Sequence, residues 1–212
     1  RSGYLAGDDA ARAADLNELF ADESVDAIFC LRGGYGSSRL LPLLDFERMR
    51  ANPKVLLGYS DITSLLLSIF HKTGLVTFHG PIAAQTITPY TLAEFKKVLL
   101  DPQPPVQIAA PPPFERGEGR VEKENRITPL VSGKVQGRLL GGNLSLVSHL
   151  VGTPYMPDLS GAILFLEDVS EAVYSIDRML TQLWLSGDLA KCSGIVFGKF
   201  TEIASSAWVQ NR

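Results

Sequence analysis

Residues 54–60 read KVLLGYS, an apolar run that ends in a glycine, a tyrosine and a serine. It is followed closely by ITSLLLSIFHK at 62–72, which has the length and leucine spacing of a helix. A short apolar run that meets a helix at a tight turn predicts a buried strand of an α/β sheet. The strand and helix over 54–72 are therefore the unit from which the fold is built.

Similar units flank this pair. DAIFCL at 26–31 predicts a second buried strand, and LVTFHGP at 75–81 predicts a third that stops at its Gly-Pro pair. Helices are expected over 9–21, 38–44 and 91–100. Strands that alternate with helices predict a parallel, doubly wound sheet of the Rossmann or flavodoxin-like kind, in an N-terminal domain over residues 1–100.

The pattern changes after residue 100. Residues 101–130 contain PQPP, APPPF and ERGEGRVEKENR, and proline and charge at this density predict a linker, with a long surface loop as the alternative. Beyond it we expect a smaller, barrel-like α/β domain over 131–212. Its expected strands are 131–140, 162–168 and 193–200, and its expected helices are 141–152 (glycine-capped) and 173–187. No strand precedes the first helix, and the last strand runs into polar residues, so the chain is expected to be truncated at both ends.

Composition narrows the class of protein. The 212 residues carry a net charge of -3 and are 45% hydrophobic, which suits a globular fold and gives no footprint for nucleic acid or an anionic membrane. No apolar run reaches the roughly 18–20 residues that span a bilayer. The two cysteines, Cys30 and Cys192, lie far apart in apolar runs, which favours reduced thiols in a cytoplasmic protein over a disulfide.

Ser60 is the first candidate for chemistry. It stands at the turn from strand to helix, where a nucleophile elbow exposes a hydroxyl and directs the next amide, that of Asp61, at a developing oxyanion. Gly58 allows close backbone approach, but Ile62 stands where such elbows usually carry a second glycine. Serine is also a favoured N-cap residue, and because caps greatly outnumber nucleophiles, this segment alone favours a helix cap.

A glycine-rich turn, RGGYG at 32–36, follows the strand at 26–31. Loops at the carboxyl ends of neighbouring parallel strands converge on one crevice, so the amides of Gly33 or Gly34 are candidates to complete an oxyanion hole beside Ser60. A tight turn that needs positive φ explains the glycines equally well. A phosphate-binding loop is a weaker alternative, because the Walker lysine is missing.

Six segments in order carry a family resemblance: FCLRGGYGSSRLL, LLGYSDIT, FHGP, GRLLGGNLSLVSHLVGTPY, LFLEDVSEAVYSIDRMLTQL and GIVFGKF. Together they resemble the LD-carboxypeptidase family of serine peptidases, which also includes the microcin immunity proteins. The resemblance implies a Ser-Glu-His triad with Ser60 as nucleophile and Glu167 as its carboxylate. It also implies that the amides of Gly34 and Asp61 form the oxyanion hole.

The resemblance further implies the substrate and its contacts. The expected reaction is hydrolysis of the bond to the C-terminal D-alanine of murein tetrapeptides during peptidoglycan recycling, in a cytoplasmic homodimer with no metal, cofactor, nucleic acid or membrane as partner. Expected substrate-binding residues are Gly33, Tyr35, His79 and Asn143. Arg32 and Arg178 are candidates for the substrate's terminal carboxylate, and Asp168 and Glu171 compete with Glu167 for the triad position.

The triad histidine is the gap in this assignment. In the family it lies close to the C-terminus, beyond the segment that GIVFGKF matches, and residues 201–212 contain no histidine. His71 suits a helix surface, His149 suits packing, and His79 ends a strand beside the crevice at a different family position. We therefore expect the general base to lie outside this chain.

Two other functions stay open. An immunity-type hydrolase of peptide-nucleotide conjugates needs an aromatic side chain to stack on a base, and neither Trp184 in a helix nor Trp208 in the tail is well placed for it. A non-catalytic binding module that keeps the crevice without the base is the alternative from a different class.

Overall fold

The computed structural model describes residues 3–84, 87–104, 106–107, 115–116, 120–121 and 128–203. The described residues form two compact units. One combines residues from 1–84 with residues from 135–212, and the other lies within 85–134. The first unit holds every candidate site residue.

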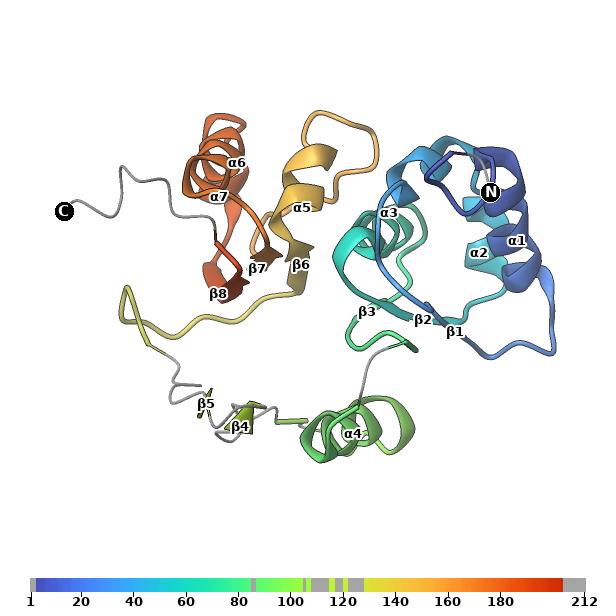
Figure 1. Cartoon of the computed structure of the whole chain (residues 1–212), viewed down its shortest axis with the longest axis horizontal. Coiled ribbons are helices and arrows are strands. Elements are labelled where there is room, and N and C mark those ends of the chain that lie inside the picture. Colours follow the sequence, from blue (N-terminus) through green and yellow to red (C-terminus); the bar gives the residue numbers. More distant parts are fainter. Residues whose placement is uncertain are drawn as a thin grey trace. The chain divides into compact units, whose positions relative to one another are not determined.

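The first half of this unit is a parallel sheet with the strand order β1-β2-β3 (Figure 1). Ala27 pairs with Val55, and Gly58 pairs with His79. Its elements are α1 (Asp9–Ala21), β1 (Ala27–Phe29), η1 (Ser37–Leu43), α2 (Phe46–Ala51), β2 (Val55–Gly58), η2 (Ser60–Ile62), α3 (Thr63–Thr73) and β3 (Phe78–His79).

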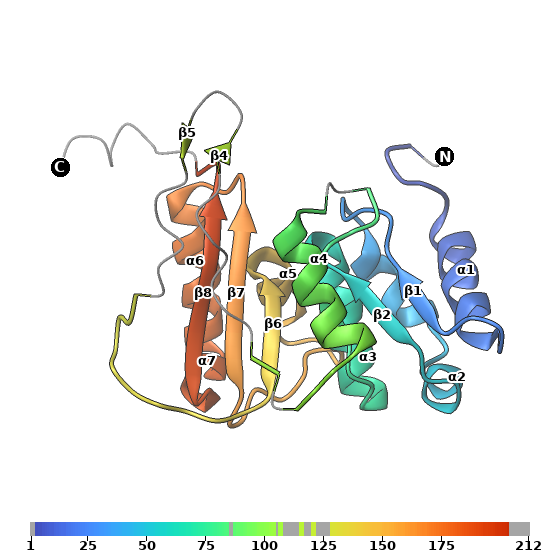
Figure 2. The same cartoon turned by 90° about the horizontal axis from the view of Figure 1, so that it is seen from below.

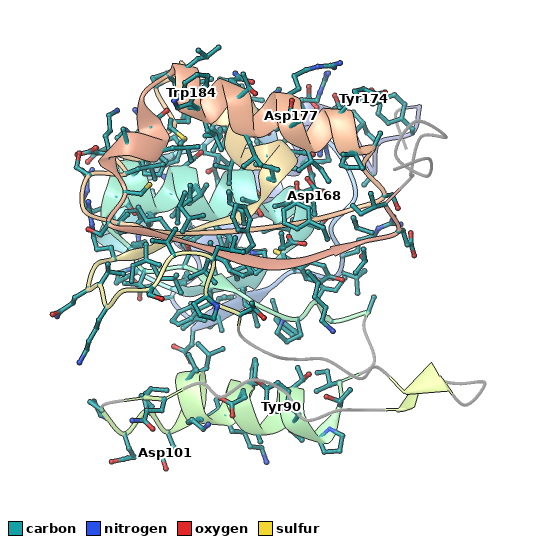
Figure 3. All side chains as sticks on the ribbon, turned by 90° about the vertical axis from the view of Figure 1, so that its left-hand side faces the viewer. Tyr90, Asp101, Asp168, Tyr174, Asp177 and Trp184 are labelled. Atoms are coloured by element: carbon teal, nitrogen blue, oxygen red, sulfur yellow. The ribbon has the colours of Figure 1, made fainter. Side chains whose placement is uncertain are left out.

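The second half is another parallel sheet, with the order β6-β7-β8 (Figure 2). Its elements are β6 (Leu139–Asn143), α5 (Leu144–Leu150), β7 (Ile163–Val169), α6 (Val173–Leu185), α7 (Asp188–Lys191) and β8 (Gly194–Thr201). Figure 3 shows α6 along one face of this sheet, with Tyr174 near its start and Trp184 near its end. Ile176, Met179 and Leu183 recur at helical spacing and pack into the core, so the apolar stripe of α6 explains its position.

One hydrophobic core joins the two halves. Leu56 of β2 and Ile69 of α3 are in the same buried cluster as Leu144 of α5 and Leu164 of β7. The α3 helix is apolar over most of its length and contacts both β6 and α5. The core is therefore continuous across residues that are far apart in the sequence. The hydrogen bond from Asn143 N to Thr63 Oγ1 joins the same two halves across 80 positions.

The second unit contains α4 (Pro89–Phe95), η3 (Lys96–Leu100), β4 (Glu115–Arg116) and β5 (Arg120–Val121). Thr88 caps α4 by accepting a hydrogen bond from the Thr91 amide, and proline occupies the first helical turn, where no intrahelical N–H partner is needed. Much of the expected linker at 101–130 lies outside the described residues.

The expectation of an α/β fold with parallel sheets is confirmed, with two differences. Among the described residues, β6, β7 and β8 form an open sheet and not a barrel. The boundary between the expected strand at 131–140 and helix at 141–152 is also wrong, because Gly141 and Gly142 lie inside β6. Both have positive φ, and a Cβ on Gly141 would lie 1.9 Å from the Phe165 carbonyl oxygen, so close packing of strands and not helix capping explains these glycines.

Candidate active site

Ser60 occupies a strained turn between β2 and α3. Its φ is +62°, and among the described residues it shares positive φ without being glycine only with Ser170 and Glu202. Its hydroxyl makes no hydrogen bond within the described part of the chain, so it does not cap the helix. A residue other than glycine keeps a positive φ only where the surrounding structure enforces it, and such strained backbone is frequent at functional sites. The geometry therefore contradicts the helix-cap interpretation and agrees with an elbow that presents a free hydroxyl.

Gly33 packs directly against this serine. A Cβ on Gly33 would lie 2.8 Å from the Ser60 Cβ and 3.1 Å from its Oγ. The carboxyl ends of β1 and β2 therefore meet at the hydroxyl, as expected for adjacent parallel strands. Gly34 follows with a φ of +117°, so the turn at this point favours glycine.

Asp61 ties the glycine loop to the elbow. Its carboxylate accepts a hydrogen bond from the Ser37 amide at 2.9 Å. The Ser37 hydroxyl contacts both the Asp61 carbonyl and, at 2.6 Å, the Ser64 hydroxyl. All of these groups are buried. The sequence pointed to the backbone amide of Asp61, whereas the clamp made by its side chain was missed because its partner lies 24 residues away.

Glu167 lies near the end of β7, on the face opposite Asp168. Successive side chains of a strand point to opposite faces, and here Leu164, Leu166 and Asp168 are the buried set. Burial, and then the negative charge of Asp168, raise the pKa of Glu167 to about 7. Its Oε1 atom is buried and has no hydrogen-bond partner among the described residues. An unsatisfied buried carboxylate oxygen is costly, so this atom is available to a donor that completes the site.

His79 is a basic group that lies close to Glu167. Its Nε2 atom lies 3.9 Å from Glu167 Oε1. The imidazole makes edge contacts with the rings of Tyr59, at 6.1 Å, and Phe165, at 5.5 Å. Burial lowers the pKa of His79 to about 4, so the ring is neutral at physiological pH. No hydrogen bond between His79 and the Ser60 hydroxyl occurs in the residues that the structure describes.

Gly142 and Asn143 connect the two sheets. The Asn143 amide donates to Thr63 Oγ1 at 3.0 Å, and a Cβ on Gly142 would lie 2.6 Å from that same oxygen. Thr63 follows Ser60 by three residues, and Asn143 is the register partner of Glu167 on β7. This joint therefore sets the position of the candidate nucleophile relative to the candidate carboxylate, and no local sequence pattern indicated it.

Asn143 and Asp168 have extensive structural bonds. The Asn143 side chain donates to Asp168 at 2.7 Å and accepts from the Leu146 amide, which makes it the N-cap of α5. Asp168 also accepts from the amide and hydroxyl of Ser145, and Figure 3 shows it beneath α6. The other triad competitor, Glu171, accepts from the Ser145 hydroxyl at 3.3 Å. Glu167 thus keeps a carboxylate oxygen without a partner in the described residues, whereas Asp168 and Glu171 both accept hydrogen bonds from Ser145.

Tyr35 is 67% exposed at the tip of the glycine loop and contacts the Tyr4 ring at 5.8 Å. The Arg32 guanidinium approaches Gly34, since a Cβ there would lie 3.8 Å from it. Arg178 instead lies over the Tyr174 ring on α6, 5.3 Å from its centroid. The structure therefore places Arg32, and not Arg178, beside the glycine loop.

The remaining sequence candidates lie elsewhere. His71 is exposed near the end of α3, and His149 is exposed on α5. Both cysteines are free thiols whose pKa is raised by burial. Within the described ranges, no group of three or more metal-ligating side chains occurs. In the same ranges, every helix is too short or too polar to cross a bilayer.

Comparison with known proteins agrees with this geometry. Residues 1–80 match the LD-carboxypeptidase N-terminal domain, and residues 136–212 match the LD-carboxypeptidase C-terminal domain. A probable murein peptide carboxypeptidase of Bacillus subtilis is 42% identical over 204 residues, which cover 93% of this chain and 59% of the relative. The microcin C7 self-immunity protein of Escherichia coli is 35% identical over 214 residues, which cover 92% of this chain and 62% of the relative.

A solved structure extends the comparison to the fold. The muramoyltetrapeptide carboxypeptidase of Oxalobacter formigenes superposes with a TM-score of 0.81 at 33% identity, covering 100% of this chain and 69% of that one. The chain spans about 60% of the length of the curated relatives that it matches. Because it matches both the N-terminal and the C-terminal domain of the LD-carboxypeptidase family, this chain belongs to that family.

Proposed function

We propose that the protein is a serine carboxypeptidase that removes the C-terminal D-alanine from murein tetrapeptides by hydrolysing an L,D-peptide bond. The single observation that carries this proposal is the Ser60 elbow, a free hydroxyl held at positive φ against the glycine loop. The names of the carboxypeptidase relatives support the substrate class.

In the proposed reaction, Ser60 Oγ attacks the carbonyl carbon of the scissile bond while a histidine accepts the hydroxyl proton. Collapse of the tetrahedral intermediate expels the amino group of D-alanine, which takes that proton, and leaves an ester on Ser60. Water then attacks the ester, with the same histidine as base, and releases the tripeptide. The amides of Gly34 and Asp61 are proposed to bind the oxyanion, with the Asp61–Ser37 clamp holding both donors in place.

Glu167 is proposed to orient the histidine and to stabilise its protonated form. Its unpartnered Oε1 gives that imidazole an acceptor. The raised pKa of Glu167 fits this role, because a cationic imidazole beside it favours the ionised carboxylate and lowers the pKa again. We place the histidine where the family resemblance puts it, beyond the segment that contains β8.

Substrate recognition is proposed at the same edge of the sheet. Arg32 lies beside the glycine loop and is our candidate for the terminal carboxylate, since a guanidinium matches a carboxylate with two parallel hydrogen bonds. Gly33 and Tyr35 flank it, and His79 and Asn143 complete the proposed lining. A cytoplasmic location, a homodimer and the two-domain division at residues 101–130 also remain proposals.

The test is release of D-alanine by the intact protein from an L-Ala-D-Glu-meso-diaminopimelate-D-Ala tetrapeptide, followed by mass spectrometry. Cleavage that is lost in Ser60→Ala supports the proposal. Cleavage of an aminoacyl-sulfamoyl nucleoside in place of the tetrapeptide would assign the immunity-type hydrolase. Tight binding of tetrapeptide without turnover would assign a binding module, and either result would overturn the carboxypeptidase proposal.

A further inference from the structure

His79 carries a half-buried imidazole, its side chain 24% exposed, that takes no part in the proposed bond-making and bond-breaking steps. It ends β3 directly opposite Gly58, two residues before the candidate nucleophile. Tyr59 and Phe165 contact its ring edge-on, and the Gly142 backbone closes a third side, where a Cβ would lie 3.0 Å from Nδ1. The elbow, β7 and β6 thus contact the ring, and its other nitrogen, Nε2, is the atom that lies 3.9 Å from Glu167 Oε1.

The two groups that face each other are complementary. Glu167 Oε1 is buried without a partner in the described structure, and His79 Nε2 is 3.9 Å from it. That distance is too long for a hydrogen bond, but such bonds at catalytic sites are often long in the unliganded protein and shorten when substrate is bound. A neutral imidazole has one N–H to donate, and a buried carboxylate is stabilised by receiving it.

We propose that His79 is a positioning residue for Glu167, and that its neutral imidazole donates from Nε2 to Oε1 of the ionised carboxylate in the assembled site. A carboxylate oxygen has two lone pairs, so Oε1 can accept from His79 and from the triad histidine together. This inference rests on the proposed function, in which Glu167 orients the base. It differs from a role for His79 as the base itself, because the ring faces the carboxylate and, in the described structure, makes no hydrogen bond to Ser60.

The groups around Glu167 differ in their effect on its charge. Asp168, the next residue on β7, raises the pKa of Glu167, as burial does. Asn143 on β6, the register partner of Glu167, has no titratable side chain. Lys199 lies on β8, which packs against the Glu167 side chain. A donated hydrogen bond from His79 therefore favours the charged form that the mechanism needs, in an environment where burial and a like charge oppose it.

The experiment compares His79→Phe and His79→Gln in the intact protein, with His71→Gln as the matched control on an exposed histidine. Phenylalanine keeps the ring contacts and removes the N–H, whereas glutamine keeps an N–H donor. The first measurement is the ¹³C NMR titration of the Glu167 side chain, assigned by its absence in Glu167→Gln. The second is the pH profile of kcat/KM for the tetrapeptide, and thermal unfolding checks that each variant is folded.

We expect the Glu167 midpoint to rise by about one pH unit in His79→Phe, the shift expected from loss of a hydrogen bond to a charged group. The acid limb of kcat/KM should move by the same amount, so that activity falls about tenfold on the acid side and changes little at alkaline pH. His79→Gln should keep the Glu167 midpoint close to that of the wild type, and His71→Gln should leave both the midpoint and the activity unchanged. His79→Leu replaces the phenylalanine variant if that variant does not fold.

Three results would overturn the inference. An unshifted Glu167 midpoint in His79→Phe would show that His79 donates no hydrogen bond to Glu167. A pH-independent loss of activity shared equally by the phenylalanine and glutamine variants makes His79 the base or a purely structural residue. A Glu167 midpoint that shifts equally in His79→Phe and His79→Gln would show that the packing of His79, and not its N–H, affects the carboxyl. Because the NMR titration needs no turnover, an inactive wild-type protein would refute the proposed function while the role of His79 is still decided.

Discussion

Gly142→Ala should disrupt the contact of Gly142 and Asn143 with Thr63, which holds the two sheets together. Gly142 has a φ of +140°, which residues with a Cβ rarely adopt, and the added Cβ would lie 2.6 Å from Thr63 Oγ1 and 2.8 Å from Thr63 Cγ2. Thr63 is 0% exposed and its Oγ1 already accepts from the Asn143 amide, so it has little room to yield.

The expected cost has two parts. Backbone strain at such a φ costs about 1–3 kcal/mol, and overpacking of a buried site costs about 1–3 kcal/mol. Together they lower the free energy of unfolding by about 2–6 kcal/mol, a large share of the roughly 5–15 kcal/mol that stabilises a typical domain. Turnover should fall as well, because the same joint positions Glu167.

Urea denaturation of the intact protein measures this effect, with Gly74→Ala as the control. Gly74 also has positive φ, +79°, but a Cβ there meets nothing within 4 Å, so its substitution should cost only about 1–2 kcal/mol. Thr63→Ala should destabilise the protein less in the Gly142→Ala background than in the wild type, because it relieves the clash. Equal effects of the two glycine substitutions, or a Thr63→Ala effect that is the same in both backgrounds, would refute this reasoning.

Three further predictions concern the site itself. Asp61→Ala should lower the free energy of unfolding by about 1–3 kcal/mol, because it leaves the buried Ser37 amide without an acceptor, and it should reduce kcat more than it changes KM. Asp61→Asn keeps an acceptor and should have smaller effects on both quantities. Equal effects of the two variants in urea melts and in kinetics would contradict the clamp. Gly33→Ala should reduce labelling of the nucleophile by a serine-directed probe at least tenfold, because its Cβ would lie 2.8 Å from the serine Cβ; undiminished labelling would contradict the packing. The pKa of Glu167 is raised to about 7, so the folded protein holds its proton more tightly than the unfolded chain, and the stability that this gives at low pH is lost as pH rises from about 4.5 through 7. The lowered pKa of His79 gives the opposite slope between about 4 and 6.5, so the wild-type profile should be nearly flat there. The shift of Glu167 corresponds to about 3 kcal/mol, and solvent screening of the partly exposed carboxylate reduces it, so Glu167→Gln should gain about 2 kcal/mol relative to wild type between pH 4.5 and 8 in urea melts. A difference that stays constant with pH would contradict the assignment.

The sequence predicted the elements that local patterns control. Short apolar runs located β1, β2, β7 and β8 to within one or two residues, because burial and turn chemistry act over a few positions. Two short helices, α2 and α7, were missed. The seven-residue helix α5 begins after Asn143, and the apolar pattern of β6 and α5 alone did not separate strand from helix.

The site was only partly predictable for a similar reason. Ser60 lies just after β2 and Glu167 lies near the end of β7, and the ends of strands can be predicted from sequence. The clamp between Ser37 and Asp61 and the contact between Gly142 and Thr63 join residues 24 and about 80 positions apart, and tertiary packing alone brings them together. The orientation of His79 toward Glu167 belongs to the same class of long-range contact.

The most direct test of the account is covalent labelling of the intact protein with a fluorophosphonate, followed by peptide mapping. We expect a single adduct on Ser60 that disappears in Ser60→Ala and forms more slowly in Glu167→Gln. An adduct on another residue, or labelling that persists unchanged in Ser60→Ala, would contradict the assignment of this hydroxyl as the nucleophile.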